Sequence, residues 1–180
     1  MNNLYSNIMD PILPKQFDKN EIYTIVITIF VLSLLYYLLK RERQLSALEV
    51  FSVYLFNLFL TTTLESLFAE PPLDMYDTID YAHAAEIFDV ILQTLVYPPP
   101  IVIAIYFYSK YQPNWLIYTL CWGMILTTLE LISLQFNLFQ FKNWTSLYSF
   151  FFYVFIMALN ILFFTKVRSV TKFIPHKYLR

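Results

Sequence analysis

Five long apolar stretches constrain the fold of this 180-residue chain more than any other feature. They cover residues 22–39, 48–69, 77–108, 115–139 and 146–165. Each is close to or above the ~20 residues that an α-helix needs to cross a ~30 Å hydrocarbon core. With 58% hydrophobic residues, the chain is also more apolar than a soluble domain, in which about half of the residues are apolar. The sequence therefore predicts an all-α, polytopic bundle of five transmembrane helices.

The segments around these stretches divide the chain into three parts. Residues 1–21 are polar and contain two prolines, which predicts an extracytoplasmic lead. Residues 22–165 form the expected five-helix transmembrane domain, and residues 166–180 form a basic cytoplasmic tail. A secretory signal is the alternative for the first stretch. However, the lead contains Asp10, Asp18 and Glu21, and no small-residue cleavage site follows the stretch, so we expect a retained helix.

The basic residues indicate how the chain is oriented in the cell membrane. With five spans, one face of the membrane receives nine Lys and Arg residues and the other receives three. The nine are Lys40, Arg41, Arg43, Lys110, Lys166, Arg168, Lys172, Lys177 and Arg180, and the three are Lys15, Lys19 and Lys142. Because cytoplasmic segments carry the excess of basic residues, we expect the C-terminus in the cytoplasm and the N-terminus outside. The predicted partner is the lipid bilayer, and no nucleic acid is expected.

An ionisable residue recurs at every third position in one stretch, at Asp74, Asp77, Asp80, His83, Glu86 and Asp89. On a helix, neighbours three apart lie on adjacent turns, so like charges repel unless a proton or a cation intervenes. No Lys or Arg occurs between Arg43 and Lys110. We therefore expect His83, protons, a metal or another molecule to neutralise these acids. Asp77 and Asp80 fit the start of a helix, whereas Glu86 and Asp89 need another explanation.

Three carboxylates on three different spans fall at one depth. At 1.5 Å per residue, Glu65, Asp89 and Glu130 all lie just below the outer boundary of the hydrocarbon core. An ionised carboxylate at the centre of a lipid-facing helix costs about 2.5–3.5 kcal/mol, so these groups should face the bundle interior or a cavity. The sequence predicts an outward-facing carboxylate pocket that binds protons or a cation. Its expected residues are Glu65, Glu86, Asp89, Gln93 and Glu130.

Polar residues at helical spacing accompany each of these acids. His83, Glu86, Asp89, Gln93 and Tyr97 form one polar stripe on the third span. Asn57, Thr61 and Thr62 lie on the same face as Glu65, and Thr127 and Ser133 lie on the same face as Glu130. These polar helix faces are consistent with a pocket. They are equally consistent with Thr and Ser side chains that join helices through interhelical hydrogen bonds.

Pro98, Pro99 and Pro100 interrupt the third span near its middle. Each proline lacks an N–H group and clashes with the carbonyl four residues earlier, so we expect this helix to kink sharply or break. The carbonyls of residues 94–96 then lose their usual donors. Freed carbonyls at membrane depth occur inside protein or beside a cavity, and broken helices near acids hold cations in many transporters. A purely structural kink is the alternative.

No arrangement of residues typical of a catalytic nucleophile is present, so no catalytic residue is predicted. His83, Glu86 and Asp89 could supply metal ligands from successive helical turns. The tetrapeptide Thr-Thr-Leu-Glu occurs at residues 62–65 and again at 127–130, which is consistent with a duplicated two-helix unit. A duplication would place the counterpart of Asp89 at position 154, where the chain has Val154.

Several of these residues also carry a resemblance. Glu130, the loop leading to Trp144, then Tyr148 and Ser149 at the start of an aromatic last span, together with the span containing Glu65, resemble a group of small multi-pass membrane proteins of spore-forming, low-GC bacteria. The resemblance implies a location in the bacterial inner membrane and implies no activity.

Three functions are compatible with these patterns. The first is a non-enzymatic sensor or membrane-complex subunit whose pocket binds protons or a cation, in association with a membrane protein partner or with further copies of the chain. The second is a small cation- or proton-coupled transporter. The third is an intramembrane metal-dependent hydrolase that uses His83, Glu86 and Asp89.

Overall fold

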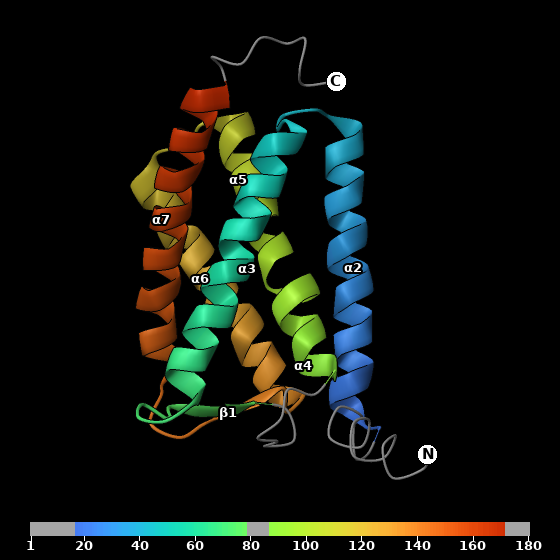
Figure 1. Cartoon of the computed structure of the whole chain (residues 1–180), viewed down its shortest axis with the longest axis vertical. Coiled ribbons are helices and arrows are strands. Elements are labelled where there is room, and N and C mark those ends of the chain that lie inside the picture. Colours follow the sequence, from blue (N-terminus) through green and yellow to red (C-terminus); the bar gives the residue numbers. More distant parts are fainter. Residues whose placement is uncertain (1–16, 79–86, 172–180) are drawn as a thin grey trace, which may run out of the picture.

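Five membrane-spanning helical segments form a bundle in the computed structural model, which describes residues 17–78 and 87–171 (Figure 1). The helices are α2 (Lys19–Arg41), α3 (Ala47–Ala69), α4 (Ile87–Ile91), η2 (Leu92–Val96), α5 (Pro98–Tyr111), α6 (Trp115–Gln135) and α7 (Ser146–Thr171). Together, α4, η2 and α5 make the third span. All five spans are long and apolar enough to cross a membrane, and the structure is 80% helical. The predicted all-α, five-helix fold class is confirmed.

The first two helices begin at capping boxes that are visible in the sequence. Asp18 caps α2, with the Glu21 side chain accepting a hydrogen bond from the Asp18 backbone N–H at 2.7 Å. Ser46 and Glu49 cap α3 in the same way, again at 2.7 Å. Each box satisfies N–H groups that have no partner within the helix. As a result, α2 begins inside the segment expected to be a polar lead, and Glu21 is fully buried.

The third span is the centre of the bundle. In its most apolar window, 56% of the residues are buried, against 33% or less in each of the other spans. Residues 101–106 are all buried, and α5 packs against α2, α3 and α7. The outer helices instead expose large apolar side chains such as Phe30, Phe59 and Phe151, as expected for surfaces in contact with lipid.

The proline segment bends the third span only slightly, by 8°. The prolines occupy the first turn of α5, where a missing N–H group costs little. The wider π-helical turn η2 precedes them, and the Tyr97 N–H donates to the Leu92 carbonyl. The Thr94 carbonyl, which was expected to lose its donor, accepts a hydrogen bond from the Tyr54 hydroxyl of α3. The expected kink is therefore a local change of hydrogen bonding with little change in helix direction.

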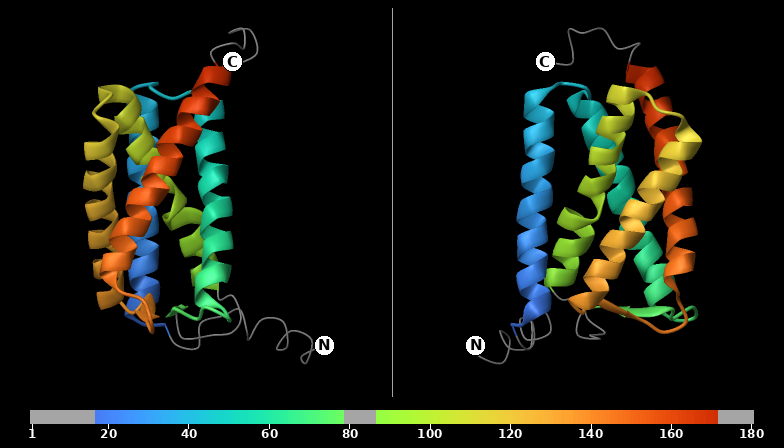
Figure 2. Two further views of the ribbon diagram at one scale, coloured as in Figure 1. Left: turned by 90° about the vertical axis from the view of Figure 1, so that its left-hand side faces the viewer. Right: turned by 180° about the vertical axis from the view of Figure 1, so that it is seen from behind.

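A short antiparallel sheet covers one end of the bundle. Strand β1 (Tyr76–Thr78) pairs with β2 (Phe139–Phe141), and Tyr76 lies opposite Phe141. In all three views, this sheet lies at the end opposite the C-terminal end of α7 (Figures 1 and 2). The prediction that a helix starts at Asp77 is wrong, because Asp77 lies in β1, and α6 ends at Gln135 rather than at residue 139. Hydrogen bonds between segments far apart in the sequence produce the sheet, so local spacing could not reveal it.

Lys142 neutralises two of the acids for which no basic partner was expected. Its ammonium nitrogen lies 2.7 Å from Oδ1 of Asp74 and 2.8 Å from Oδ1 of Asp77. These hydrogen bonds raise the pKa of Lys142. The Lys142 N–H also donates to the Met75 carbonyl at 2.9 Å, which places the side chain beside both acids. The sequence interval without Lys or Arg was therefore misleading for Asp74 and Asp77, and Asp80 lies outside the described residues.

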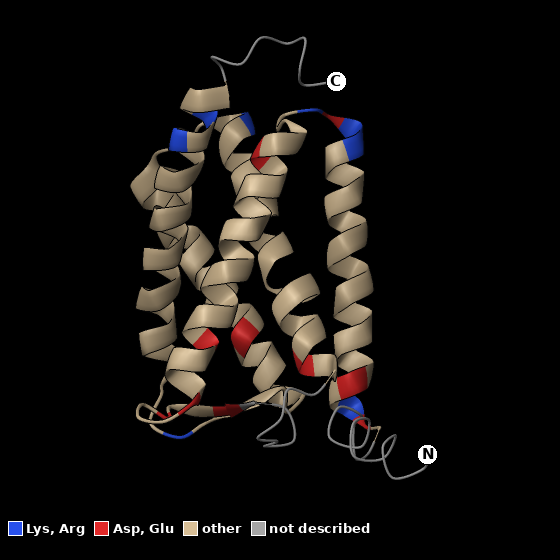
Figure 3. Cartoon of the chain, viewed as in Figure 1, with Lys and Arg blue, Asp and Glu red and all other residues tan. Residues whose placement is uncertain are grey.

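Charge is distributed unequally between the two ends of the bundle (Figure 3). Basic residues gather at the end where α2 and α7 finish, together with two ion pairs, Glu42–Lys110 at 2.7 Å and Glu49–Arg168 at 2.9 Å. The hydrogen bond from Lys110 lowers the pKa of Glu42. The opposite end, which carries the sheet, has mostly acidic residues.

Two asparagines join α3 and α7. Asn57 of α3 and Asn160 of α7 donate reciprocally to each other's side-chain oxygens, at 2.6 and 3.0 Å. By contrast, the hydroxyls of Thr61, Thr127 and Ser133 donate to carbonyls four residues earlier in their own helices. Within the residues that the structure describes, these three hydroxyls therefore form no hydrogen bonds between helices.

The only glycine of the chain, Gly123, lies where α6 meets α7. A Cβ built on Gly123 would lie 2.5 Å from Cγ2 of Val154, which is far too close. Valine is stiff at χ1 in a helix, so the side chain cannot simply rotate away. Small residues at such positions allow membrane helices to approach closely.

We expect Gly123→Ala to lower the free energy of unfolding by about 1–2 kcal/mol, because overpacking forces the two helices apart. The opposite sign would be expected from helix propensity alone, since alanine exceeds glycine by about 1 kcal/mol. Thermal unfolding in detergent, followed by circular dichroism, measures the effect. The double variant Gly123→Ala/Val154→Ala should melt above Gly123→Ala. A single variant as stable as the wild type would contradict the close contact.

Candidate functional site

A cavity of about 250 Å³ lies inside the bundle, near the end that the sheet covers. All five spans and both strands contribute residues to its lining. Three carboxyl side chains line it, Glu65 from α3, Asp89 from α4 and Glu130 from α6. Three separate helices therefore bring these carboxyl side chains to one cavity.

Glu65 and Asp89 lie next to each other on neighbouring helices, close enough for their side chains to interact. Gln93, one turn after Asp89, donates a hydrogen bond from Nε2 to Oδ2 of Asp89 at 3.1 Å. This amide orients the carboxylate but carries no charge. Among the described residues, the ion pairs involve neither Glu65 nor Asp89. The pair therefore has no described Lys or Arg partner.

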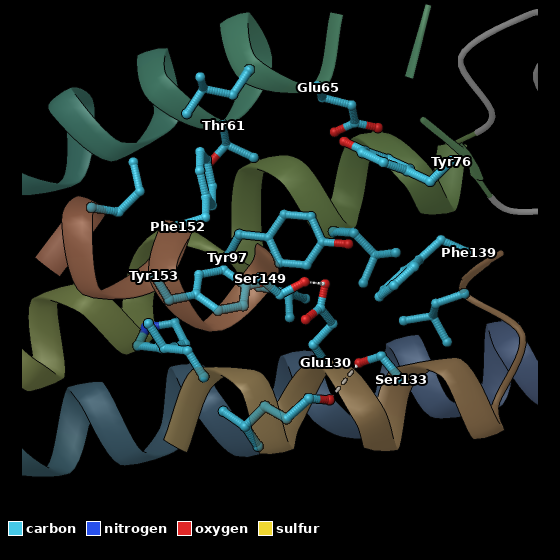
Figure 4. A pocket seen from close by; sticks show the side chains of 18 of the residues that line it. Thr61, Glu65, Tyr76, Tyr97, Glu130, Ser133, Phe139, Ser149, Phe152 and Tyr153 are labelled. Carbon is cyan, nitrogen blue, oxygen red and sulfur yellow. Dashed lines mark hydrogen bonds between the residues drawn. The ribbon is translucent and has the colours of Figure 1, made fainter. Parts of the chain in front are cut away.

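Tyr76 of β1 covers the pair from the sheet side. Its hydroxyl points toward the Glu65 carboxyl, and its ring lies against Phe139 with ring centroids 6.3 Å apart (Figure 4). Burial raises the pKa of Tyr76 above its ordinary value. The hydroxyl therefore remains a neutral group and cannot add a further negative charge beside Glu65.

Glu130 lies on the opposite wall, beyond the Tyr97 ring (Figure 4). Its Oε1 accepts a hydrogen bond from Ser149 at 2.8 Å, and Ser149 in turn accepts one from the Trp144 indole at 2.7 Å. Its Oε2 is buried and accepts no hydrogen bond of standard geometry from the described residues, although the Tyr153 hydroxyl is close enough to interact with the Glu130 carboxyl. Glu130 is only 9% exposed. An unpaired buried acceptor is costly, and each such group needs an explanation.

Aromatic rings form much of the remaining wall. Phe68, Trp144 and Phe152 contact one another, with ring centroids 5.3 to 6.2 Å apart. Tyr97 and Tyr153 also line the cavity, and both rings lie between the Glu65 and Glu130 walls (Figure 4). The site combines three acidic groups with several ring faces, and ring faces also attract cations.

The structure brings most of the predicted site residues together. Glu65, Asp89 and Glu130 line the cavity, and Gln93 contacts Asp89. His83 and Glu86 lie outside the described residues, so the proposed ligand set His83, Glu86 and Asp89 stays a prediction. Within the described ranges, no group of three or more His, Cys, Asp or Glu residues is arranged to hold a metal ion.

The polar face of α7 was not among the predicted polar helix faces. Ser149, Tyr153 and Asn160 lie on one face of α7, and all three make contacts in the bundle interior. Their spacing of four and seven residues is helical, and polar residues are few in this aromatic span. The same pattern that singled out α3 and α6 would have found this face.

Comparisons with known proteins returned no match: no protein-family model, curated protein or solved structure is similar to this chain at a significant level.

Proposed function

We propose that this integral membrane protein binds a proton or a cationic ligand between Glu65 and Asp89, and that it acts without catalysis as a sensor or as a subunit of a larger membrane assembly. The observation that carries the proposal is the neighbouring pair of carboxyls in the cavity, without an ion pair to any described basic residue.

Electrostatics explains why such a pair needs a bound positive charge. Two unit charges about 4 Å apart repel by about 4 kcal/mol at an effective dielectric constant of about 20. The Gln93 amide interacts with both carboxyls but offsets only a small part of this repulsion, because it is neutral. A proton shared by the pair, or a cation placed between the two carboxyls, removes the repulsion. A site that is unfavourable when empty can therefore report on proton or cation concentration.

The distribution of basic residues supports an orientation of the bundle, and with it a compartment for this site. The end with most of the basic residues is proposed to face the cytoplasm, because positive charges are retained there. The sheet and the cavity would then lie toward the extracytoplasmic face. The proposed signal is thus the proton or cation concentration outside the cell.

Transport is the second candidate, and one observation favours it. The π-helical turn η2 directly follows the helix that carries Asp89, and Gln93 belongs to this turn. Such turns occur frequently at functional sites and can change their hydrogen bonding. The hydrolase hypothesis gains no such support, because two of its three residues lie outside the described part of the chain.

The test is thermal unfolding of the detergent-purified protein between about pH 4 and pH 9, comparing wild type with Asp89→Asn. We expect the wild type to lose stability as pH rises, because both carboxyls must then ionise. We expect Asp89→Asn to lose less and to melt several degrees above wild type at the alkaline end. Glu70→Gln, which changes an exposed acid outside the cavity, serves as the matched control. Identical pH profiles for wild type and Asp89→Asn would remove the basis of the proposal.

A further inference from the structure

We infer that the cationic ligand of this cavity is an organic ammonium ion with an apolar body, a protonated lipophilic amine of about a dozen non-hydrogen atoms, rather than an inorganic ion. This inference rests on the proposed function and specifies its ligand.

The size of the cavity exceeds the needs of a proton or a bare metal ion. A volume of about 250 Å³ could hold about eight water molecules, at ~30 Å³ each. Apolar side chains such as Leu64, Leu92 and Ile156 line much of this space. Water there would have few partners, so an apolar body fills the space better than a hydrated ion does.

The geometry of the oxygen atoms also argues against a metal ion. Hard cations require several converging oxygen ligands at short distance. Glu65 and Asp89 are neighbours, but Glu130 stands on the opposite wall with Tyr97 between them (Figure 4). No three acidic, histidine or cysteine side chains in residues 17–78 and 87–171 are grouped to hold a metal.

The aromatic wall supplies what an ammonium ion needs and a metal ion does not use. Ring faces attract organic cations, and Arg, Lys and alkylammonium groups bind to such faces within about 6 Å. Phe68, Trp144 and Phe152 form a contiguous group on α3, the loop before α7, and α7. The ammonium group would bind the Glu65–Asp89 pair, and its carbon substituents would contact these rings.

Glu130 gives an independent indication of a ligand. Its Oε2 is one of two buried side-chain acceptors without a hydrogen bond among the described residues, and it is the one that lines the cavity, into which the carboxyl extends from α6 (Figure 4). An N–H or O–H donor at a second position of the ligand would satisfy this atom. The Ser149 and Trp144 hydrogen bonds hold the carboxyl in place for that contact.

The experiment uses the full-length protein in a non-ionic detergent near neutral pH, with octylammonium as the probe. Octanol is the uncharged control of equal chain length, and sodium and calcium chloride are the inorganic controls. Binding is followed by thermal stabilisation and by the change in tryptophan fluorescence, since Trp144 lines the cavity. The variants are Asp89→Asn and Phe152→Leu, with Glu70→Gln as the control outside the cavity.

We expect octylammonium to stabilise wild type and Glu70→Gln, and octanol to have no effect at equal concentration. Asp89→Asn and Phe152→Leu should each weaken binding by about tenfold or more. Phe152→Leu keeps every charge, so its effect separates ring contacts from simple attraction between opposite charges.

Three other outcomes would overturn the inference in different ways. If an inorganic cation stabilises wild type through Asp89 and octylammonium does not, the proposed function stands and the ligand class is wrong. If octylammonium stabilises wild type and Asp89→Asn equally, or if octanol stabilises wild type as much as octylammonium does, the stabilisation comes from partition of the probe into detergent or onto apolar surface, and the inferred site is wrong. If no cation binds and the pH profiles of wild type and Asp89→Asn coincide, the proposed function fails as well.

Discussion

Arg168→Met is expected to lower the free energy of unfolding by about 2–3 kcal/mol. The Arg168 Nε lies 2.9 Å from Oε1 of Glu49, and its Nη2 donates to the Gln44 carbonyl at 2.9 Å. Glu49 is only 4% exposed, so methionine would leave a buried carboxylate without its counter-charge. The estimate is below the value for fully buried pairs because the Arg168 side chain is 29% exposed. For a chain of this size, the expected fall in melting temperature is about 4–12 °C.

Two controls separate the lost counter-charge from other effects of the substitution. Glu49→Gln/Arg168→Met removes both charges and should recover part of the loss. Lys110→Met breaks the more exposed ion pair with Glu42, whose side chains are 28% and 35% exposed, and should give no measurable shift. If Arg168→Met and Lys110→Met melt at the same temperature, the Glu49–Arg168 pair has no special role in stability.

Asn160→Leu is expected to cost about 2 kcal/mol, because it leaves the Asn57 amide buried without its partner. Asn57 and Asn160 are 3% and 0% exposed, and they exchange two hydrogen bonds between α3 and α7. Chemical or thermal unfolding in detergent measures the change.

The matched control is the double variant Asn57→Leu/Asn160→Leu, which removes both partners and leaves no unpaired amide. It should be more stable than the sum of the single variants predicts, with a coupling energy of about 1 kcal/mol or more. Additive single effects would show that each asparagine acts alone, for example through its hydrogen bond to its own helix, at 2.8 Å for Asn57 and 3.0 Å for Asn160.

Much of the candidate site could be predicted by counting along the helices. The depths of Glu65, Asp89 and Glu130 follow from the rise of 1.5 Å per residue, and all three line one cavity. Their mutual arrangement could not be predicted in this way. Glu65 pairs with Asp89, whereas Glu130 is bound by Ser149 on α7, because helix rotation and neighbour choice decide which carboxyls meet.

The structure of the loops could not be predicted from the sequence in this way. Asp74 and Asp77 fitted a regular acidic pattern that favoured a helix, yet the structure has a strand there and pairs both acids with Lys142. The partner strand lies on the other side of two complete spans. Spacing within a short window contains no information about such a partner.

The sequence by itself determined the five spans. Backbone groups in lipid must form hydrogen bonds within their own helix, so each spanning segment is helical. The length of each apolar stretch then decides whether the helix can cross the membrane. It also determined the starts of α2 and α3, since a capping box is a local contact. Polar residues indicated the inward face of α3, α4 and α6, but only the tertiary structure decided which helices are neighbours and how the remaining faces are buried. Lipid tails are as apolar as a protein core, so apolar residues do not mark the buried face. That choice depends on the few contacts that lipid cannot replace: Asn57 with Asn160, Glu130 with Ser149, and Gly123 against Val154.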